Sequence, residues 1–128
     1  MERNSEIYQT YLGILREELI PALGCTEPIA VAYAAAKARA LLGEMPKHMV
    51  ARCSGNIIKN VKGVVVPTTR NLRGIPAAAI LGAYGGNPDQ GLEVLSSVTP
   101  EQLKTVKELL AKKICDEELL DTPAKLHI

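Results

Sequence analysis

The spacing of apolar residues predicts two helices in the first third of the chain. Between residues 5 and 20, apolar side chains recur every three or four positions, as they do on one face of a helix. A second helix is expected over residues 27–42, with Thr26 as its cap and Gly43 as its stop. Its sequence is rich in alanine and carries no charge from Pro28 until Lys37, so we expect its first half to be buried.

Two further helices are predicted in the second half of the chain. Residues 74–84 are small and apolar, with Pro76 in the first turn, which is typical of a helix start. Thr99-Pro100-Glu101-Gln102 resembles a capping box. The helix that this box opens is expected to turn five apolar residues inward: Leu103, Val106, Leu109, Leu110 and Ile114.

Three short segments have the pattern of strands. Apolar side chains occupy every second position over most of residues 47–53 and again over residues 124–128, and residues 64–67 are three valines followed by a proline. The predicted fold class is therefore α+β, dominated by helices with a few short strands, and a wholly helical core is the alternative. Because a strand needs a partner, we expect the segment at 124–128 to lead into more chain. Residues 1–128 are thus expected to form one domain that is the front piece of a longer polypeptide.

Composition excludes several classes of protein. The 128 residues hold 15 Lys and Arg against 14 Asp and Glu, a net charge of +1, so bulk charge predicts no nucleic-acid partner. No apolar run is long enough to span a bilayer, so no membrane partner is expected either. Three cysteines without framework spacing favour reduced thiols and a cytoplasmic location.

Charge is distributed unevenly along the chain. Residues 45–88 contain no Asp or Glu, six of the ten glycines and six basic residues: Lys47, Arg52, Lys59, Lys62, Arg70 and Arg73. Positive charge beside glycine backbone suits a small anion such as a carboxylate or a phosphate. An ordinary solvated basic face is the alternative.

Cys25 is the first candidate functional residue, because of its position. It lies directly before the predicted buried helix, where the helix dipole favours a thiolate, so we expect its pKa to fall. A thiolate in that place would serve as a metal or cluster ligand, or as a nucleophile. The alternative is a small apolar residue that fills a turn.

The other cysteines and the histidines carry less functional information. Cys53 ends a predicted strand and Cys115 ends a predicted helix, so both are interpreted as structural. The spacing of the three cysteines fits no compact zinc motif. His48 and His127 alternate with apolar neighbours and are interpreted as surface or edge residues.

The stretch from Ser54 to Asn60 concentrates polar donors around one glycine. A loop of this composition would hold an amino-acid carboxylate through Ser54, Asn56 and Lys59. Lys59 would also act as a base if it were buried, because desolvation lowers the pKa of an ammonium group. A capped turn with one solvated lysine is equally consistent with the sequence.

Four segments in this order resemble one known family. They are Ala22 to Ala30 with its Gly24-Cys25-Thr26-Glu27-Pro28 core, Ser54 to Lys62, Val65-Val66-Pro67, and Gly91 to Leu95. The sequence resembles the N-terminal part of the L-cysteine desulfidase and L-serine dehydratase alpha-chain-like family, over nearly the whole chain.

This resemblance implies a cytoplasmic lyase with a [4Fe–4S] cluster that acts on a small amino acid. It would eliminate hydrogen sulfide from L-cysteine, or water from L-serine, to give pyruvate and ammonia. Cys25 would be the first of three cluster ligands, the other two lying beyond Ile128, so this chain alone is expected to be inactive. Thr26, Ser54, Asn56 and Asn60 are the candidate substrate-binding residues, and Lys59 is the candidate catalytic base.

The sequence departs from the family pattern at one place and leaves two other functions open. Two glycines that the family commonly has after Val-Val-Pro are Arg70 and Asn71 here, which puts substrate choice in doubt. One alternative function is a non-catalytic module that binds a small carboxylate or forms a homodimer through its small-residue helices. The other is a thiol enzyme with Cys25 as its nucleophile.

Overall fold

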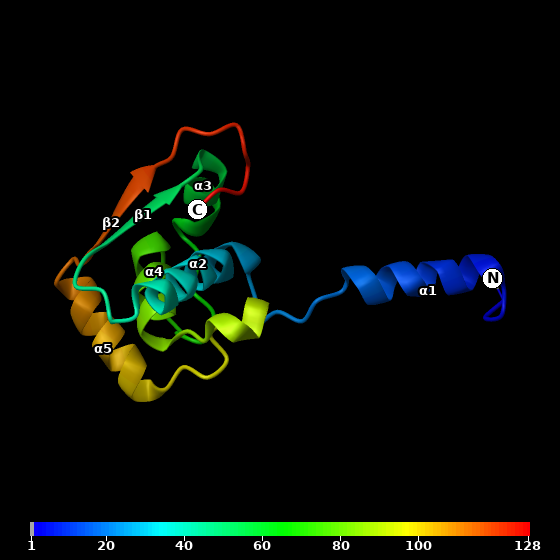
Figure 1. The fold of residues 1–128 in the computed structure, drawn as a ribbon, viewed down its shortest axis with the longest axis horizontal. Coiled ribbons are helices and arrows are strands. Elements are labelled where there is room, and N and C mark those ends of the chain that lie inside the picture. The colour runs from blue at the N-terminus through cyan, green and yellow to red at the C-terminus, as the bar shows by residue number, and fades with distance from the viewer. Residues whose placement is uncertain (1) are drawn as a thin grey trace.

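Helix α4 (Ile75–Gly85) is the centre of the fold, and the other elements pack around it. The structure, a computed structural model, describes residues 2–128, and eight of the eleven α4 residues are buried. Helix α2 (Thr26–Leu42) packs against α4, with α5 (Pro100–Ala111) on another side. Figure 1 shows the two strands beside this helix cluster. The buried residues of these elements form one hydrophobic core.

Small residues let α2 and α4 approach closely. A Cβ placed on Gly82 of α4 would overlap the carbonyl oxygen of Ala32 on α2 and lie only 2.6 Å from its Cα. Gly86, at the end of α4, is also confined, because its Cβ would lie 3.1 Å from that of Ala36. The alanine-rich composition of both helices therefore has a packing reason: larger side chains would separate the two backbones.

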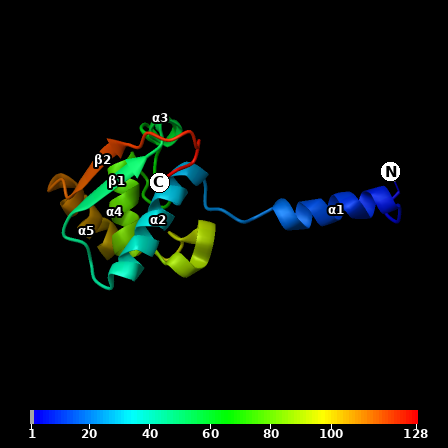
Figure 2. The same cartoon turned by 45° about the horizontal axis from the view of Figure 1, so that its top comes forward.

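Two strands form a parallel sheet. Strand β1 (Met49–Cys53) pairs with β2 (Cys115–Leu119), Met49 lying opposite Cys115. The helix α3 (Gly55–Val61) follows β1 directly, and a short 3-10 segment (Pro88–Glu93) follows α4. Figure 2 shows that the sheet lies along one side of the helices, with α4 and α5 behind it. The predicted α+β, helix-dominated fold class is confirmed, and the wholly helical alternative is wrong.

Helix α1 (Glu6–Glu18) extends away from the rest of the molecule, as Figures 1 and 2 show. Ser5 caps it by accepting a hydrogen bond from the N–H of Tyr8. None of its residues is buried, and its apolar stripe, which includes Ile7, Tyr11 and Leu15, is largely exposed. The predicted helix is confirmed, but its apolar face contacts no core in this chain.

The structure confirms two predicted helix ends, the start of α5 and the end of α2. Thr99 accepts from the N–H of Gln102 at 3.2 Å, and its own N–H donates to the Gln102 side chain at 2.9 Å, which confirms the capping box. Gly43 ends α2 in the left-handed conformation, as predicted. Thr26 is not the cap of α2, because the helix begins one residue earlier than expected and Cys25 occupies the cap position.

Three predictions about extended segments are wrong or incomplete. Residues 64–67 form no strand, only one isolated bridge between Val65 and Arg73. Residues 124–128 form no strand either. The second strand is β2, which the sequence did not predict, and residues 55–61 are a helix rather than a loop.

Candidate functional site

Cys25 lies at an exposed turn that packs against a second loop. Gly24 before it has φ +152°, and a Cβ there would lie 3.3 Å from the ring of Pro67. The turn around Cys25 is thereby held against the loop that follows Val66. Two of the segments that the sequence singled out are neighbours in space.

The thiol of Cys25 does not have the lowered pKa that its position at the helix start suggested. Its Sγ donates a hydrogen bond to the carboxylate of Glu27 at 3.3 Å. Partial burial raises the pKa of Cys25 first, and the hydrogen bond to Glu27 raises it further. The expected fall in pKa is therefore wrong, because partial burial and then the neighbouring Glu27 both disfavour the thiolate.

Helix α3 presents the second group of candidate residues. Asn56 and Lys59 are exposed on it and Asn60 is half-buried. Among the described residues, no side-chain hydrogen bond is recorded for these three or for Thr26 at the start of α2. These side chains could meet a ligand, but none of them lines either of the two hollows described below. The exposure of Lys59 also removes the burial on which its role as a base depends.

Ser54 already has hydrogen-bond partners within the chain. It is buried, its hydroxyl donates to the carbonyl of Lys125 at 2.7 Å, and it accepts from the N–H of His127 at 3.3 Å. The side chain that was expected to hold a carboxylate thus fixes the last residues of the chain. A substrate would have to displace that segment to reach Ser54.

The other two cysteines lie on the inner side of the sheet. Burial raises the pKa of the Cys53 thiol to about 11, and burial also raises the pKa of Cys115. All three thiols are free. The interpretation of Cys53 and Cys115 as structural residues agrees with their burial, although Cys115 begins a strand rather than ending a helix.

The described residues do not fit a [4Fe–4S] cluster by themselves. Such a cluster is held by several cysteine thiolates, and only Cys25 is exposed. Over residues 2–128 there is no group of three or more His, Cys, Asp or Glu side chains placed to hold a metal ion. Cys25 can offer one ligand, and any others would have to come from elsewhere.

A hollow between the loop after Pro67 and helix α5 gathers positive charge. It has a volume of about 720 Å³, and Arg70 shares its lining with Lys104 and Lys107 of α5. No acidic residue lines it. The sequence drew attention to Arg70 but missed the two lysines, since nothing in the sequence places α5 beside this loop.

The loop itself has an unusual backbone. Thr68 and Arg70 both have positive φ, at 71° and 66°, which is uncommon for residues with side chains. The buried hydroxyl of Thr69 closes the loop by donating to the Val66 carbonyl at 2.6 Å and accepting from the N–H of Leu72 at 3.2 Å. One of the two expected glycine positions, Arg70, is thus a place where glycine would be favoured.

Two side chains of the basic segment, Arg52 and His48, have acidic partners on β2. Arg52 donates to Glu118 at 2.8 Å, and His48 lies 3.0 Å from Asp116. These pairs are exposed, so each is worth about 0–1 kcal/mol. Of the six basic residues that the sequence left available for an anion, Arg52 is thus paired with an acidic residue.

The exposures of the thiols predict a clear order of reactivity. We expect a maleimide at neutral pH to modify Cys25 in the folded chain while Cys53 and Cys115 stay unmodified until the protein is unfolded, because buried thiols are inaccessible and un-ionised. Mass spectrometry of peptides from native and urea-treated samples measures this. Equal labelling of Cys53 and Cys25 in the native protein would contradict the placement of β1.

The described residues therefore form a helix-dominated α+β fold that carries an exposed thiol at Cys25 and a basic hollow beside α5. No helix in the described part of the chain is long and apolar enough to cross a membrane. No protein-family model matches the sequence, and the search of solved structures gives no significant match.

Comparison with curated proteins gives clear relatives. The chain is 57% identical over 122 residues to a UPF0597 protein of Lachnoclostridium phytofermentans, which is 95% of this chain and 29% of that protein. It is 52% identical over all 128 residues to a UPF0597 protein of Treponema denticola, covering 30% of it, and 50% identical over 122 residues to one of Desulfitobacterium hafniense, covering 28%. The chain thus spans less than a third of the length of these relatives.

These similarities correct the family inferred from the motifs. The relatives are named UPF0597 proteins and not cysteine desulfidases or serine dehydratases. The predicted membership in the desulfidase and dehydratase family is therefore wrong, and the chain is instead similar to UPF0597 proteins. Their names state no activity, so function has to be argued from the residues.

Proposed function

We propose that this chain is one part of a longer cytoplasmic lyase that acts on a free amino acid. The reaction is loss of the α-proton and the β-substituent of L-cysteine or L-serine, which gives aminoacrylate and hydrogen sulfide or water. Aminoacrylate then hydrolyses to pyruvate and ammonia. The observation that supports this proposal is the exposed thiol of Cys25, held at the start of a helix whose first half is largely buried.

In this proposal the described residues have limited roles. Cys25 contributes one ligand to the reacting centre, and a cluster would take its remaining ligands from outside these residues. Thr26, Asn56 and Asn60 contact the amino acid from α2 and α3. Ser54 joins them only if residues 125–127 move away, and Lys59 acts as a base only if other chain buries it. This chain alone is therefore inactive.

The test uses the longest native polypeptide that contains this sequence, purified without oxygen. We expect it to release sulfide from L-cysteine or pyruvate from L-serine, and we expect Cys25→Ala to abolish this activity because a ligand is lost. Cys115→Ala is the matched control and should retain activity. The proposal fails if Cys25→Ala keeps full activity, or if the 128-residue chain alone is active above its own Cys25→Ala variant.

A second candidate function is a non-catalytic module that binds a small carboxylate. The basic hollow favours it, because Arg70, Lys104 and Lys107 surround a space with no acidic residue. Unlike the lyase, this function needs no thiol. The homodimer predicted with this second function would have to use surface other than α4, because the small residues of α4 are buried against α2 within the chain.

Calorimetric titration of the 128-residue chain with L-serine, and with sodium acetate, tests this second function. We expect weak, salt-sensitive binding that falls at least about tenfold in the double variant Lys104→Ala and Lys107→Ala, because two of three cations are lost. Lys112→Ala is the control, since Lys112 follows the same helix but does not line the hollow. Equal affinity in all three proteins would exclude the hollow as the binding site.

A further inference from the structure

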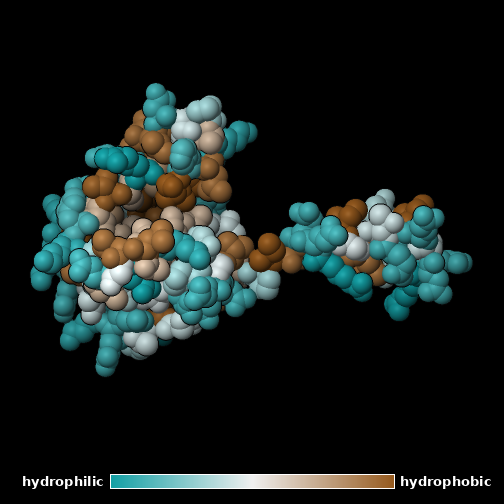
Figure 3. Space-filling model, viewed as in Figure 1, coloured by the Kyte–Doolittle hydropathy of each residue, from teal (hydrophilic) through white to brown (hydrophobic). Residues whose placement is uncertain are grey.

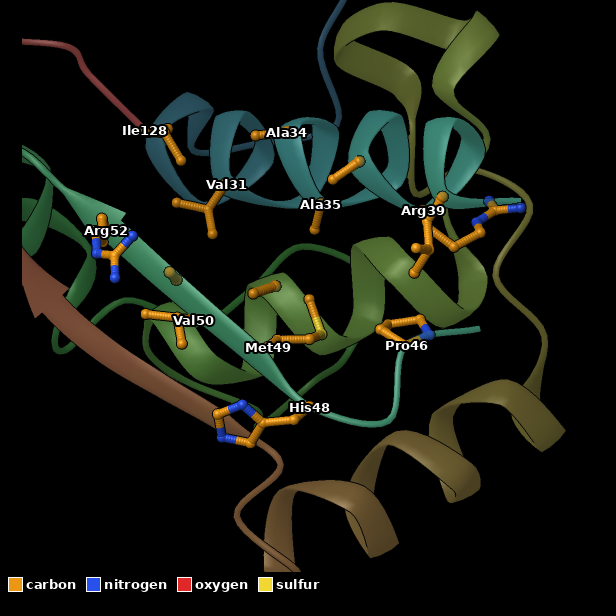
Figure 4. A pocket seen from close by; sticks show the side chains of 14 residues that line it. Val31, Ala34, Ala35, Arg39, Pro46, His48, Met49, Val50, Arg52 and Ile128 are labelled. Carbon is orange, nitrogen blue, oxygen red and sulfur yellow. The ribbon is translucent and has the colours of Figure 1, made fainter. Parts of the chain in front are cut away.

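An apolar groove separates β1 from α2. Its volume is about 450 Å³, and small α2 residues, among them Val31, Ala34 and Ala35, form one wall. Figure 3 shows hydrophobic surface around a hollow on this face of the molecule. Figure 4 shows β1 along the other wall, with Arg39 at one end of the groove and Ile128 near the opposite end. The groove therefore runs along the side of β1 that faces α2.

The backbone of β1 is unpaired along this side. In the parallel register, Met49, Ala51 and Cys53 turn their N–H and C=O groups toward β2, as shown by the bonds from Met49 to Ile114 and from Leu120 to Cys53. Val50 and Arg52 turn theirs the opposite way, and no hydrogen bond of the described residues uses them. An open strand edge of this kind is a template for another strand.

The last residues of the chain already reach this open edge. The N–H of Ser54, directly after β1, donates to the carbonyl of His127 at 2.8 Å. Ile128 then lines the groove together with Val50 and Arg52. Past the Ser54 contact, the chain therefore points along β1 toward Met49, which is the direction of an antiparallel partner.

We propose that the residues that follow Ile128 in the longer polypeptide fill this groove as a third strand, antiparallel to β1. The first residue after Ile128 would exchange hydrogen bonds with Arg52, and the third would do so with Val50. The result is a three-stranded mixed sheet, with β1 in its centre.

Three observations favour the residues after Ile128 as the segment that fills the groove. The relatives at 50–57% identity are more than three times as long as the matched region, so longer polypeptides of this kind exist. The hydrogen bond between Ser54 and His127 is placed as the first bond of an antiparallel ladder, and Ile128 already lies in the groove. At the far end of the groove, Arg39 donates from Nη2 to the Gly86 carbonyl, while its buried Nε has no partner among the described residues. If the Arg39 side chain turns toward the groove, a carbonyl oxygen of the added strand would satisfy this Nε.

The proposal also specifies a residue pattern. Opposite residues in an antiparallel pair point to the same face, and the inward residues of β1 are Met49, Ala51 and Cys53. The second and fourth residues after Ile128 therefore face inward and are expected to be apolar, and the second is expected to be of modest size. The first and third face outward beside Arg52 and Val50, where polar residues are tolerated.

Amide hydrogen exchange, read residue by residue, compares the 128-residue chain with the native longer polypeptide. We expect Val50 and Arg52 to exchange at least about tenfold more slowly in the longer polypeptide. Ala51 and Cys53 are the internal controls, because β2 protects them in both proteins. Fast exchange of Val50 and Arg52 in the longer polypeptide would overturn the proposal.

The same experiment distinguishes this strand from a second copy of the chain bound in the groove. Protection of Val50 and Arg52 that is already present in the 128-residue chain and rises with its concentration would assign the groove to a second copy and overturn the proposal. An intact mass showing that the native polypeptide ends at Ile128 would overturn it too.

A pair of proline variants gives an independent test by urea unfolding. Val50→Pro removes an N–H that β2 does not use, so the unfolding midpoint should fall clearly in the longer polypeptide and little in the 128-residue chain. Ala51→Pro removes an N–H bonded to β2 and should lower the midpoint in both. Equal effects of Val50→Pro in the two proteins would overturn the proposal.

Discussion

Replacing Gly82 by alanine is expected to destabilise the fold by about 3 kcal/mol or more. The new Cβ would overlap the carbonyl oxygen of Ala32 and lie 2.6 Å from its Cα, both of which are backbone atoms. No side-chain rotation relieves such an overlap, so α2 and α4 must move apart. Because these helices hold most of the core, the separation should also loosen the residues packed around them.

The matched control for this substitution is Gly13→Ala. Gly13 lies inside α1, and a Cβ there meets nothing within 4 Å. Alanine has the higher helix propensity, so this variant is expected to be neutral or to gain up to about 1 kcal/mol. Urea unfolding followed by circular dichroism measures both variants. A Gly82→Ala protein as stable as the parent would show that α2 and α4 do not cross at this glycine.

Alkaline pH is expected to destabilise the protein through Cys53. In the folded chain, burial first and Glu117 and Cys115 next raise the pKa of this thiol from 9.0 to about 11. Between pH 9 and 11 the unfolded chain therefore loses a proton that the folded chain keeps. Stability is fully present below pH 9 and falls as the pH rises to 11, by roughly 2–3 kcal/mol from this group.

The Cys53→Ala variant isolates this effect from other groups that titrate at high pH. Its absolute stability should be lower, because a buried side chain is truncated, but its stability should fall less steeply than that of the parent between pH 9 and 11. The measurement is the free energy of unfolding in urea at pH 8, 9.5 and 11. Parallel curves for parent and variant would mean that Cys53 ionises freely in the folded chain.

The helices could be predicted from the sequence because their signals are local. The capping box at Thr99, the stop at Gly43 and the apolar spacing of α1 all lie within a few residues of the element they define. Strand β1 could be predicted for the same reason, from its alternation. The short helix α3 was not predicted, because Ser54-Gly55-Asn56 is as typical of a turn as of a helix cap; in the structure Ser54 is the cap of α3.

Strand β2 could not be predicted from local pattern. Its sequence, Cys115 to Leu119, has three acidic residues in the middle and little strand propensity. What favours the strand is a partner 66 positions earlier, since Arg52 pairs with Glu118 across the ladder. One long-range signal was the opposite charge of the two segments, since the acidic strand β2 supplies partners for Arg52 and His48 in the acid-free segment.

The candidate site was predicted in part. The sequence located the exposed Cys25 turn, but the effect of Glu27 on its thiol depended on a side-chain hydrogen bond that spacing does not specify. The partners of Ser54 come from residues 125–127, more than 70 positions away. The basic hollow needed the loop at Arg70 and helix α5 to be neighbours, which is a tertiary fact.

The pairing of β1 with β2 also has a consequence for how the chain folds. Met49 and Cys115 are 66 positions apart, so closing the sheet costs more loop entropy than docking α2 on α4, and the sheet is expected to form after α2 and α4 have docked. During synthesis β1 therefore emerges with both edges open and remains so until β2 has been made. Over that interval β1 is expected to be prone to aggregation through both edges, and pairing with the acidic strand β2 then covers one of them.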